Sequence, residues 1–152
     1  MPFAYDDGGR EAAGFKGDAR DCVCRAIAIA TGRPYREVYD KLNELGKAER
    51  ASKKRTRSNA RNGVFKATTR KAMEFFGLEW VPLMKIGSGC TVHLRPDELP
   101  AGTLVAKVSR HVVAVIDGVT HDTFDPSRGG NRCVYGYWKA PKPVTLTVER
   151  RK

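Results

Sequence analysis

The chain has 152 residues, of which 41% are hydrophobic and 30% charged, and its formal net charge is +11. This length allows one domain with a substantial core, and the absence of a run of about 18 apolar residues argues against a membrane span. The opening "MPFAYDDGGREAAG" lacks the basic and apolar regions of a secretory signal. We therefore expect a single domain over residues 1–152, located in the cytoplasm without membrane contact, with its cysteines reduced.

The positive charge is concentrated in one segment. Between Lys47 and Lys71 the sequence has ten Lys or Arg residues and one acid, which gives +9 there and leaves +2 for the rest of the chain. Such a segment suits contact with nucleic acid or an acidic protein, although solvated surface loops have the same composition. The candidate binding residues of this basic segment are Lys53, Lys54, Arg55, Arg57 and Arg61.

The first part of the chain predicts a loosely held lead-in followed by two helices. Residues 1–20 are rich in glycine and aspartate and have no apolar periodicity. Residues 21–31 are apolar on most faces, which predicts a buried helix that ends at Gly32. Pro34 suits the first turn of a second helix, which runs to about Leu45 and ends at Gly46.

The basic stretch 47–63 lacks periodicity and predicts a loop. A third helix is expected over Lys66–Phe76, with Phe75 and Phe76 facing inward and Gly77 as its stop. The chain then becomes rich in β-branched and aromatic residues, and Gly, Pro, Asp or Ser separate the runs. The predicted strands are 78–84, 91–94, 103–108, 111–116, 119–124, 133–138 and 144–149. Helices followed by strands indicate an α+β fold with an antiparallel sheet.

The chain has four cysteines, namely Cys22, Cys24, Cys90 and Cys133. "CVC" and the later "CTVH" contain residue types that bind zinc, but the two thiols of "CVC" point in different directions on a helix, which disfavours a zinc site. Core packing suits Cys90, Cys133 and one of the first two, because free cysteine often behaves as a small hydrophobic residue.

Catalysis is a third interpretation of the thiols. A thiol at a helix N-terminus lies at the positive end of the macrodipole, which lowers its pKa and favours the nucleophilic thiolate. Such a nucleophile needs a histidine base and a group that orients it. The segment "SRHVVAVIDGVTHDTFDPS" offers both, because His111 opens a predicted strand and Asp125 follows the return strand. His93 and His121 lack this context and are expected to be surface or structural residues.

This arrangement resembles the papain-like cysteine peptidases. A cysteine at the start of a buried helix, a histidine that opens a hydrophobic strand and Asp-Pro after the next strand are similar to the compact bacterial C39-like type, with "DC…A…A" and "HVV…DP". The resemblance implies an α+β fold in which the nucleophile helix packs against an antiparallel sheet. It also implies Cys22 as nucleophile, His111 as base and Asp125 as orienting group.

One position departs from the papain-like pattern, which usually has Gln about six residues before the cysteine as an oxyanion donor. Lys16 has that position relative to Cys22, and Asp18 has it relative to Cys24. Oxyanion stabilisation is therefore expected from Lys16 or from the backbone N–H of Cys22. The missing amide leaves an inactive or acyl-transferring relative open. Cys22 is favoured over Cys24 as nucleophile because it lies closer to the helix N-terminus.

The identity of the acid depends on the turn between two predicted strands. A two-residue loop at Asp117-Gly118 puts His111 on the same face as Asp122. A one-residue bulge, for which Gly118 is well suited, or a three-residue loop shifts the register and brings His111 to Asp125 instead. The resemblance selects Asp125 and keeps Asp122 as the alternative.

The sequence thus predicts a papain-like thiol hydrolase that cleaves peptide, amide or isopeptide bonds in a protein or peptide substrate and needs no metal or organic cofactor. The alternative is a non-catalytic protein with a papain-like scaffold that binds nucleic acid or an acidic protein through residues 47–71. The aromatic residues of "RCVYGYW" (132–138) are expected in the core behind the site.

Overall fold

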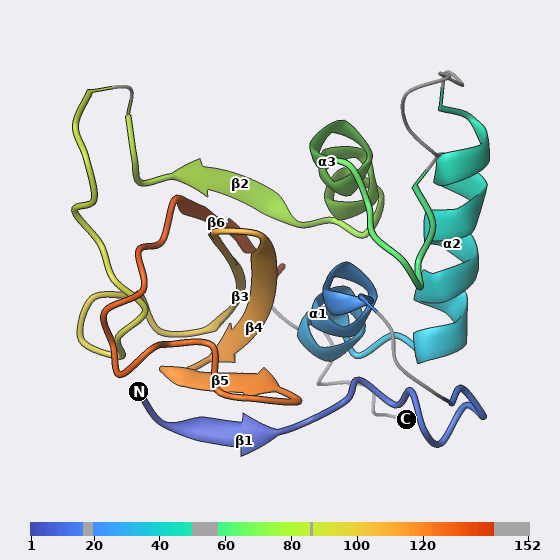
Figure 1. Cartoon of the computed structure of the whole chain (residues 1–152), viewed down its shortest axis with the longest axis horizontal. Coiled ribbons are helices and arrows are strands. Elements are labelled where there is room, and N and C mark those ends of the chain that lie inside the picture. The colour runs from blue at the N-terminus through green and yellow to red at the C-terminus, as the bar shows by residue number, and fades with distance from the viewer. Residues whose placement is uncertain (17–19, 50–57, 86, 142–152) are drawn as a thin grey trace.

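The computed structural model describes residues 1–16, 20–49, 58–85 and 87–141. Within these residues, three helices lie beside a six-stranded sheet (Figure 1). The strand order is β1-β5-β4-β3-β6-β2, and all neighbours are antiparallel except β1 and β5. The predicted α+β class is confirmed, but the sheet is mixed rather than purely antiparallel.

The helices are α1 (Cys22–Thr31), α2 (Tyr35–Lys47) and α3 (Lys66–Phe75). α1 and α3 agree with the prediction to within one residue at each end. Gly32 follows α1 with a φ of 70°, the left-handed conformation that glycine adopts without steric cost. Pro34 is the N-cap of α2 rather than its first residue, and α2 continues past Gly46.

Two details of the helical half differ from the prediction. A Cβ on Gly46 would lie 2.0 Å from the carbonyl oxygen of Ser58. Glycine is therefore required there by the close approach of two backbone segments, and it does not stop the helix. Phe75 is 59% exposed, with Lys41 Nζ 4.0 Å from its ring centre, whereas Phe76 is buried. Only one of the two phenylalanines thus faces the core.

The strands are β1 (Phe3–Tyr5), β2 (Glu79–Pro82), β3 (Thr103–Val108), β4 (His111–Ile116), β5 (Val119–Asp122) and β6 (Gly136–Lys139). Because β1 pairs with β5, the start of the chain is not the loose lead-in that we expected. The predicted strand at 91–94 is reduced to a single bridge between His93 and Cys133. The predicted strand at 144–149 lies outside the described residues.

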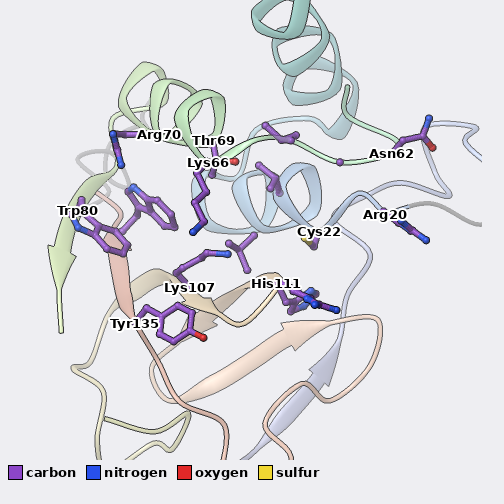
Figure 2. A pocket seen from close by; sticks show the side chains of 16 residues that line it. Arg20, Cys22, Asn62, Lys66, Thr69, Arg70, Trp80, Lys107, His111 and Tyr135 are labelled. Atoms are coloured by element: carbon purple, nitrogen blue, oxygen red, sulfur yellow. The ribbon is translucent and has the colours of Figure 1, made fainter. Parts of the chain in front are cut away.

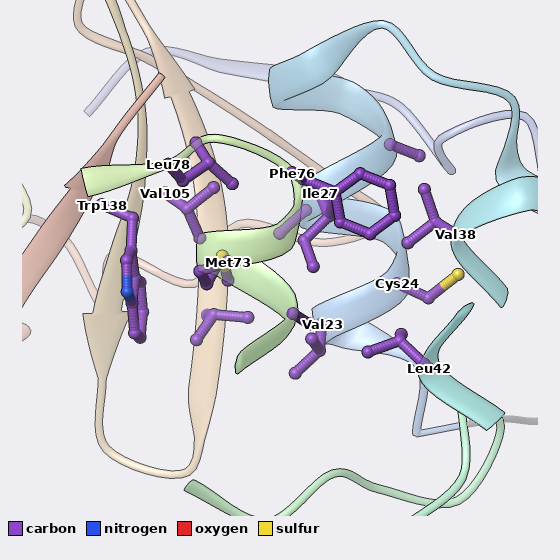
Figure 3. Close-up of a cluster of buried hydrophobic side chains, with 14 of the residues drawn as sticks. Val23, Cys24, Ile27, Val38, Leu42, Met73, Phe76, Leu78, Val105 and Trp138 are labelled. Atoms are coloured by element: carbon purple, nitrogen blue, oxygen red, sulfur yellow. The ribbon is translucent and has the colours of Figure 1, made fainter. Parts of the chain in front are cut away.

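The core is divided between the two faces of the sheet. α1 packs against β4 on one side and against α2 on the other (Figure 1). Figure 3 shows the cluster between the helices and the sheet, which includes Ile27, Val38, Leu42, Met73 and Trp138. A second cluster on β3 and β4 packs against residues of the 92–99 and 134 regions. This burial on both sides explains why "HVVAVI" is an apolar run and does not alternate.

A disulfide joins Cys90 to Cys133, with the two Cα atoms 5.8 Å apart. Cys90 is exposed, so the expectation of reduced, core-packed thiols is wrong for this pair. Disulfides persist mainly in oxidising environments, and the cytoplasmic location stays a prediction. None of the described helices is long and apolar enough to cross a bilayer.

Candidate active site

Cys22 is the first residue of α1, and its half-buried thiol lies at the wall of a pocket (Figure 2). Asp21 occupies the N-cap position but makes no side-chain cap hydrogen bond. The first helical hydrogen bond runs from the Arg25 N–H to the Asp21 carbonyl oxygen. The N–H groups of the first turn precede this bond and have no carbonyl partner within the helix, so this end of α1 favours negative charge near Cys22.

His111 is placed beside Cys22 by the β3–β4 hairpin. Val108 pairs with His111 across a two-residue turn in which Arg110 has a φ of 56°. The imidazole is 9% exposed, and the ring of Phe124 lies 5.2 Å from it, centre to centre. Figure 2 shows His111 and Cys22 at the same end of the pocket.

The electrostatics of the two side chains are coupled. Burial by itself raises the pKa of Cys22, but a hydrogen bond and the charge of His111, with the backbone N–H of Val112, bring this pKa below its ordinary value. Burial likewise opposes protonation of the imidazole, yet hydrogen bonds with Asp122 and Cys22 raise the pKa of His111 above its ordinary value. Both shifts favour a thiolate–imidazolium pair.

The acid that contacts His111 is Asp122. The Nε2 atom of His111 and the Oδ2 atom of Asp122 are 2.6 Å apart, and Asp122 is 2% exposed. Asp125, which the resemblance selected, instead accepts a hydrogen bond at 2.9 Å from the backbone N–H of Ser127. It therefore closes a local turn and does not orient the imidazole.

The turn chemistry explains the choice of acid. Asp117 and Gly118 have φ values of 47° and 81°, which make a two-residue type I′ turn. Ile116 then pairs with Val119 without a bulge. The register shift that would have brought Asp125 to His111 is absent from this hairpin, and the two-residue alternative is the observed one.

Asp122 is also part of a network of buried charged side chains. Arg25 on α1 bridges two carboxylates, because its Nη2 atom lies 3.0 Å from Asp122 Oδ1 and its Nη1 atom contacts Asp21. The second oxygen of Asp21 accepts a hydrogen bond from the Tyr35 hydroxyl at 2.6 Å and lies 3.4 Å from Nε of Arg10. Sequence reasoning missed this network. Its signal was a single arginine inside a helix that is otherwise apolar.

The second thiol, Cys24, belongs to the core. It is fully buried between α1 and α2 (Figure 3), and its Sγ atom lies 3.7 Å from the carbonyl oxygen of Tyr35. Burial raises the pKa of Cys24 to about 12. The two neighbouring thiols thus have opposite character, and only Cys22 is suited to nucleophilic attack. Among the described residues, no group of three or more His, Cys, Asp or Glu side chains is arranged so that it could hold a metal ion.

The candidate oxyanion residue Lys16 does not line the pocket. It is exposed, and its carbonyl oxygen accepts hydrogen bonds from Arg10 and Arg61. The expected cationic donor is therefore missing from this position, which leaves the backbone N–H groups at the start of α1 as donors. Arg20 and Asn62 line the pocket on the side of Cys22 (Figure 2).

Four of the five candidate binding residues of the basic segment, Lys53, Lys54, Arg55 and Arg57, lie outside the described residues. Arg61 is half-buried, and its guanidinium donates to the Lys16 carbonyl oxygen at 3.0 Å while its own carbonyl accepts the Arg20 N–H. The described part of the segment therefore ties the chain before α1 to the chain before α3.

The remaining histidines lie outside the pocket lining. His93 contacts Glu98 at 3.2 Å, and His121 lies 3.7 Å from Asp6, in agreement with structural roles. The aromatic residues of 132–138 are divided. Trp138 is buried in the core, as expected, whereas Tyr135 is 37% exposed, and both line the pocket.

The pocket has a volume of about 450 Å³ and extends from Cys22 and His111 toward β2 and β6. Comparisons of the chain with protein-family models, curated proteins and solved structures gave no match. The chemistry of this site must therefore be argued from its own residues.

Proposed function

We propose that the protein is a thiol hydrolase of papain-like type that cleaves amide bonds in a peptide or protein, with Cys22, His111 and Asp122 as its catalytic residues. One observation carries the proposal: the chain of contacts from the Cys22 thiol through His111 to Asp122, at the wall of a pocket large enough for a substrate side chain. The order of nucleophile helix and histidine strand supports the papain-like type.

The first half of the reaction forms an acyl-enzyme. The Cys22 thiolate attacks the carbonyl carbon, and the N-terminal N–H groups of α1 stabilise the resulting oxyanion. The His111 imidazolium then donates its proton to the amide nitrogen. The C–N bond breaks, the amine leaves, and a thioester joins the acyl group to Cys22.

The second half restores the enzyme. Neutral His111 takes a proton from water while the oxygen attacks the thioester carbon, and the C–S bond breaks to release a carboxylic acid and the thiolate. Asp122 keeps the imidazole in one orientation and stabilises its protonated form throughout. Arg25 holds Asp122 by its other oxygen and acts as a positioning residue.

The test is the rate of alkylation of Cys22 by iodoacetamide as a function of pH, read by peptide mass spectrometry. Because His111 lowers the pKa of the thiol, the rate should rise at a lower pH than for a free cysteine, whose pKa is about 8.5. In His111→Ala the rise should move to higher pH, and the rate at pH 6.5 should fall about tenfold or more, since each pKa unit changes the thiolate fraction tenfold.

Cys24→Ser and Cys22→Ser are the matched controls. The first should leave the labelling rate unchanged, because Cys24 is buried and faces α2. The second should abolish rapid labelling. Equal rates at both cysteines, or a pH profile that His111→Ala does not move, would remove the basis for a thiol hydrolase.

A further inference from the structure

The pocket beside Cys22 is lined by positive charge. Its charged lining residues are Arg20, Lys66, Arg70, Lys107 and Arg110, and none of the described aspartates and glutamates lines it. The ion pairs between described residues all involve other side chains. Five cations without a described carboxylate partner around one hollow favour an anionic occupant.

Among these five cations, the position of Lys107 says most about where an anionic ligand would bind. Lys107 projects from β3 into the pocket, between the Cys22–His111 end and Trp80 (Figure 2). It is half-buried, and burial, together with the charges of Lys66 and Arg132, lowers its pKa against the opposing effect of Cys22. A lysine that is half-buried near other cations and has no described carboxylate partner is stabilised when a ligand supplies a carboxylate.

The far wall of the pocket is aromatic. Trp80 on β2 and Trp138 on β6 pair across the strands, with ring centres 4.5 Å apart. Gly136 makes room for this wall, since a Cβ there would lie 2.4 Å from the Trp80 ring. Gly136 is also the partner of Lys107 in the β3–β6 register, so the cation and the aromatic wall lie on adjacent strands.

We propose that this pocket binds the side chain of a glutamate or aspartate next to the scissile bond, so that the enzyme acts on acidic peptide segments. The inference rests on the proposed function. Lys107 and Lys66 meet the carboxylate, and the apolar surface of Trp138 and Val112 covers the methylene groups.

A peptide explains these features better than a nucleic acid. A volume of about 450 Å³ suits a side chain and its flanking backbone rather than a helical polymer. The thiolate at one end needs an acyl carbon to attack, which a polynucleotide backbone does not have. An oligonucleotide is therefore included in the test as the competing ligand.

The first test compares the alkylation of Cys22 by iodoacetate and by iodoacetamide, which differ in charge and little in size. In each reaction the Cys22 sulfur forms a bond to carbon and iodide leaves. We expect the ratio of the iodoacetate rate to the iodoacetamide rate to exceed that of N-acetylcysteine. Lys107→Gln should lower this ratio about three- to tenfold, since one unit charge acts over a few ångströms in a partly solvated site.

Lys85→Gln is the matched control, because Lys85 is exposed and does not line the pocket. It should leave the ratio unchanged. The charge preference should also decrease as salt is raised from about 0.01 to 1 M, since screening shortens the range of the field. A ratio that is the same in the original chain and in Lys107→Gln would overturn the inference.

The second test uses two dipeptide acyloxymethyl ketones that carry glutamate or glutamine next to the reactive carbon. The glutamate probe should label Cys22 faster, and Lys66→Gln with Lys107→Gln should remove the difference. Equal labelling in the original chain, or protection of Cys22 by a single-stranded oligonucleotide but not by a poly-glutamate peptide, would contradict it.

The two proposals fail in different ways. If neither iodoacetamide nor the ketones label Cys22 selectively, the thiol hydrolase is wrong. If labelling is selective and depends on His111 but shows no charge preference, only the acidic substrate class is wrong.

Discussion

The orientation and the charge of His111 depend on Asp122, and both carboxylate oxygens of Asp122 have partners. Asp122 contacts the imidazole with one oxygen and Arg25 with the other, and its Oδ1 also accepts the Thr123 N–H at 2.7 Å. Burial opposes the charge of this acid, but these partners bring the pKa of Asp122 below its ordinary value. It therefore stays ionised to lower pH than a free carboxyl group, and its charge keeps the imidazole protonated to higher pH.

Asp122→Asn tests this role, with Asp125→Asn as its matched control. The amide keeps the shape of Asp122 but loses the charge that favours the imidazolium, so the iodoacetamide rate of Cys22 at pH 6 should fall about tenfold or more. Asp125→Asn should change this rate less than about twofold, because an asparagine oxygen also closes an Asx turn. The pH profile of labelling reports both, and a larger effect from Asp125→Asn would reverse the assignment.

Among the individual residues, Cys22 could be predicted from the sequence as the candidate nucleophile, whereas two aspartates remained as candidates for the acid. The position of Cys22 at a helix start was readable from the pattern, and so was the context of His111. The acid was not, because the resemblance favoured a bulge at Gly118, and only the φ values of the turn distinguish the two registers. The prediction that Lys16 stabilises the oxyanion was also wrong. Its spacing from Cys22 in the sequence does not determine the path that the chain takes between the two residues.

α1 brings Cys22, the proposed nucleophile, and Arg25 of the charge network to one face of the sheet. Cys22 and Arg25 are three residues apart, which puts both side chains on the same side of the helix. Cys22 meets His111 of β4, and Arg25 meets Asp122 of β5. The docking of this one helix therefore sets the geometry of the whole site.

Arg25→Met is expected to lower the free energy of unfolding by about 3–5 kcal/mol, because it removes the buried guanidinium that bridges Asp21 and Asp122. Arg33→Met removes the same chemical group from an exposed pair with Glu37 and should change stability by less than about 0.5 kcal/mol. The side chains of the two arginines are 9% and 53% exposed. Urea unfolding followed by tryptophan fluorescence measures the difference, and equal losses would argue against a structural role for the network.

The elements themselves were largely predictable. Glycine stops and apolar periodicity gave α1 and α3, and the β-branched runs gave β3, β4 and β5, because these signals are local. β1 was missed since a three-residue strand pairs through its backbone and leaves almost no side-chain pattern. Gly46 was misread because the approach of Ser58 to α2 is a tertiary contact that no local pattern reports.

At the scale of the whole molecule, the sheet lies between the site and two segments that the Cys90–Cys133 disulfide joins, which we call the cover. The helices and the pocket lie on one face, and the other face packs Leu94, Leu99 and Val134 against β3 and β4. The disulfide joins the two segments that carry these residues, and its cysteines are 43 positions apart in the sequence. This pairing was not predicted, because the expected cytoplasmic location argued for free thiols.

The disulfide predicts two free thiols in the unfolded, unreduced protein and four after reduction, which thiol titration in denaturant measures. Cys90→Ser with Cys133→Ser should lower the free energy of unfolding by about 2–4 kcal/mol, since a cross-link over a loop of this length restricts the unfolded chain. Iodoacetamide labelling of Cys22 should stay within about twofold of the original rate, because the cover and the pocket are on opposite faces of the sheet. Four free thiols before reduction would show that the two segments are held by packing alone.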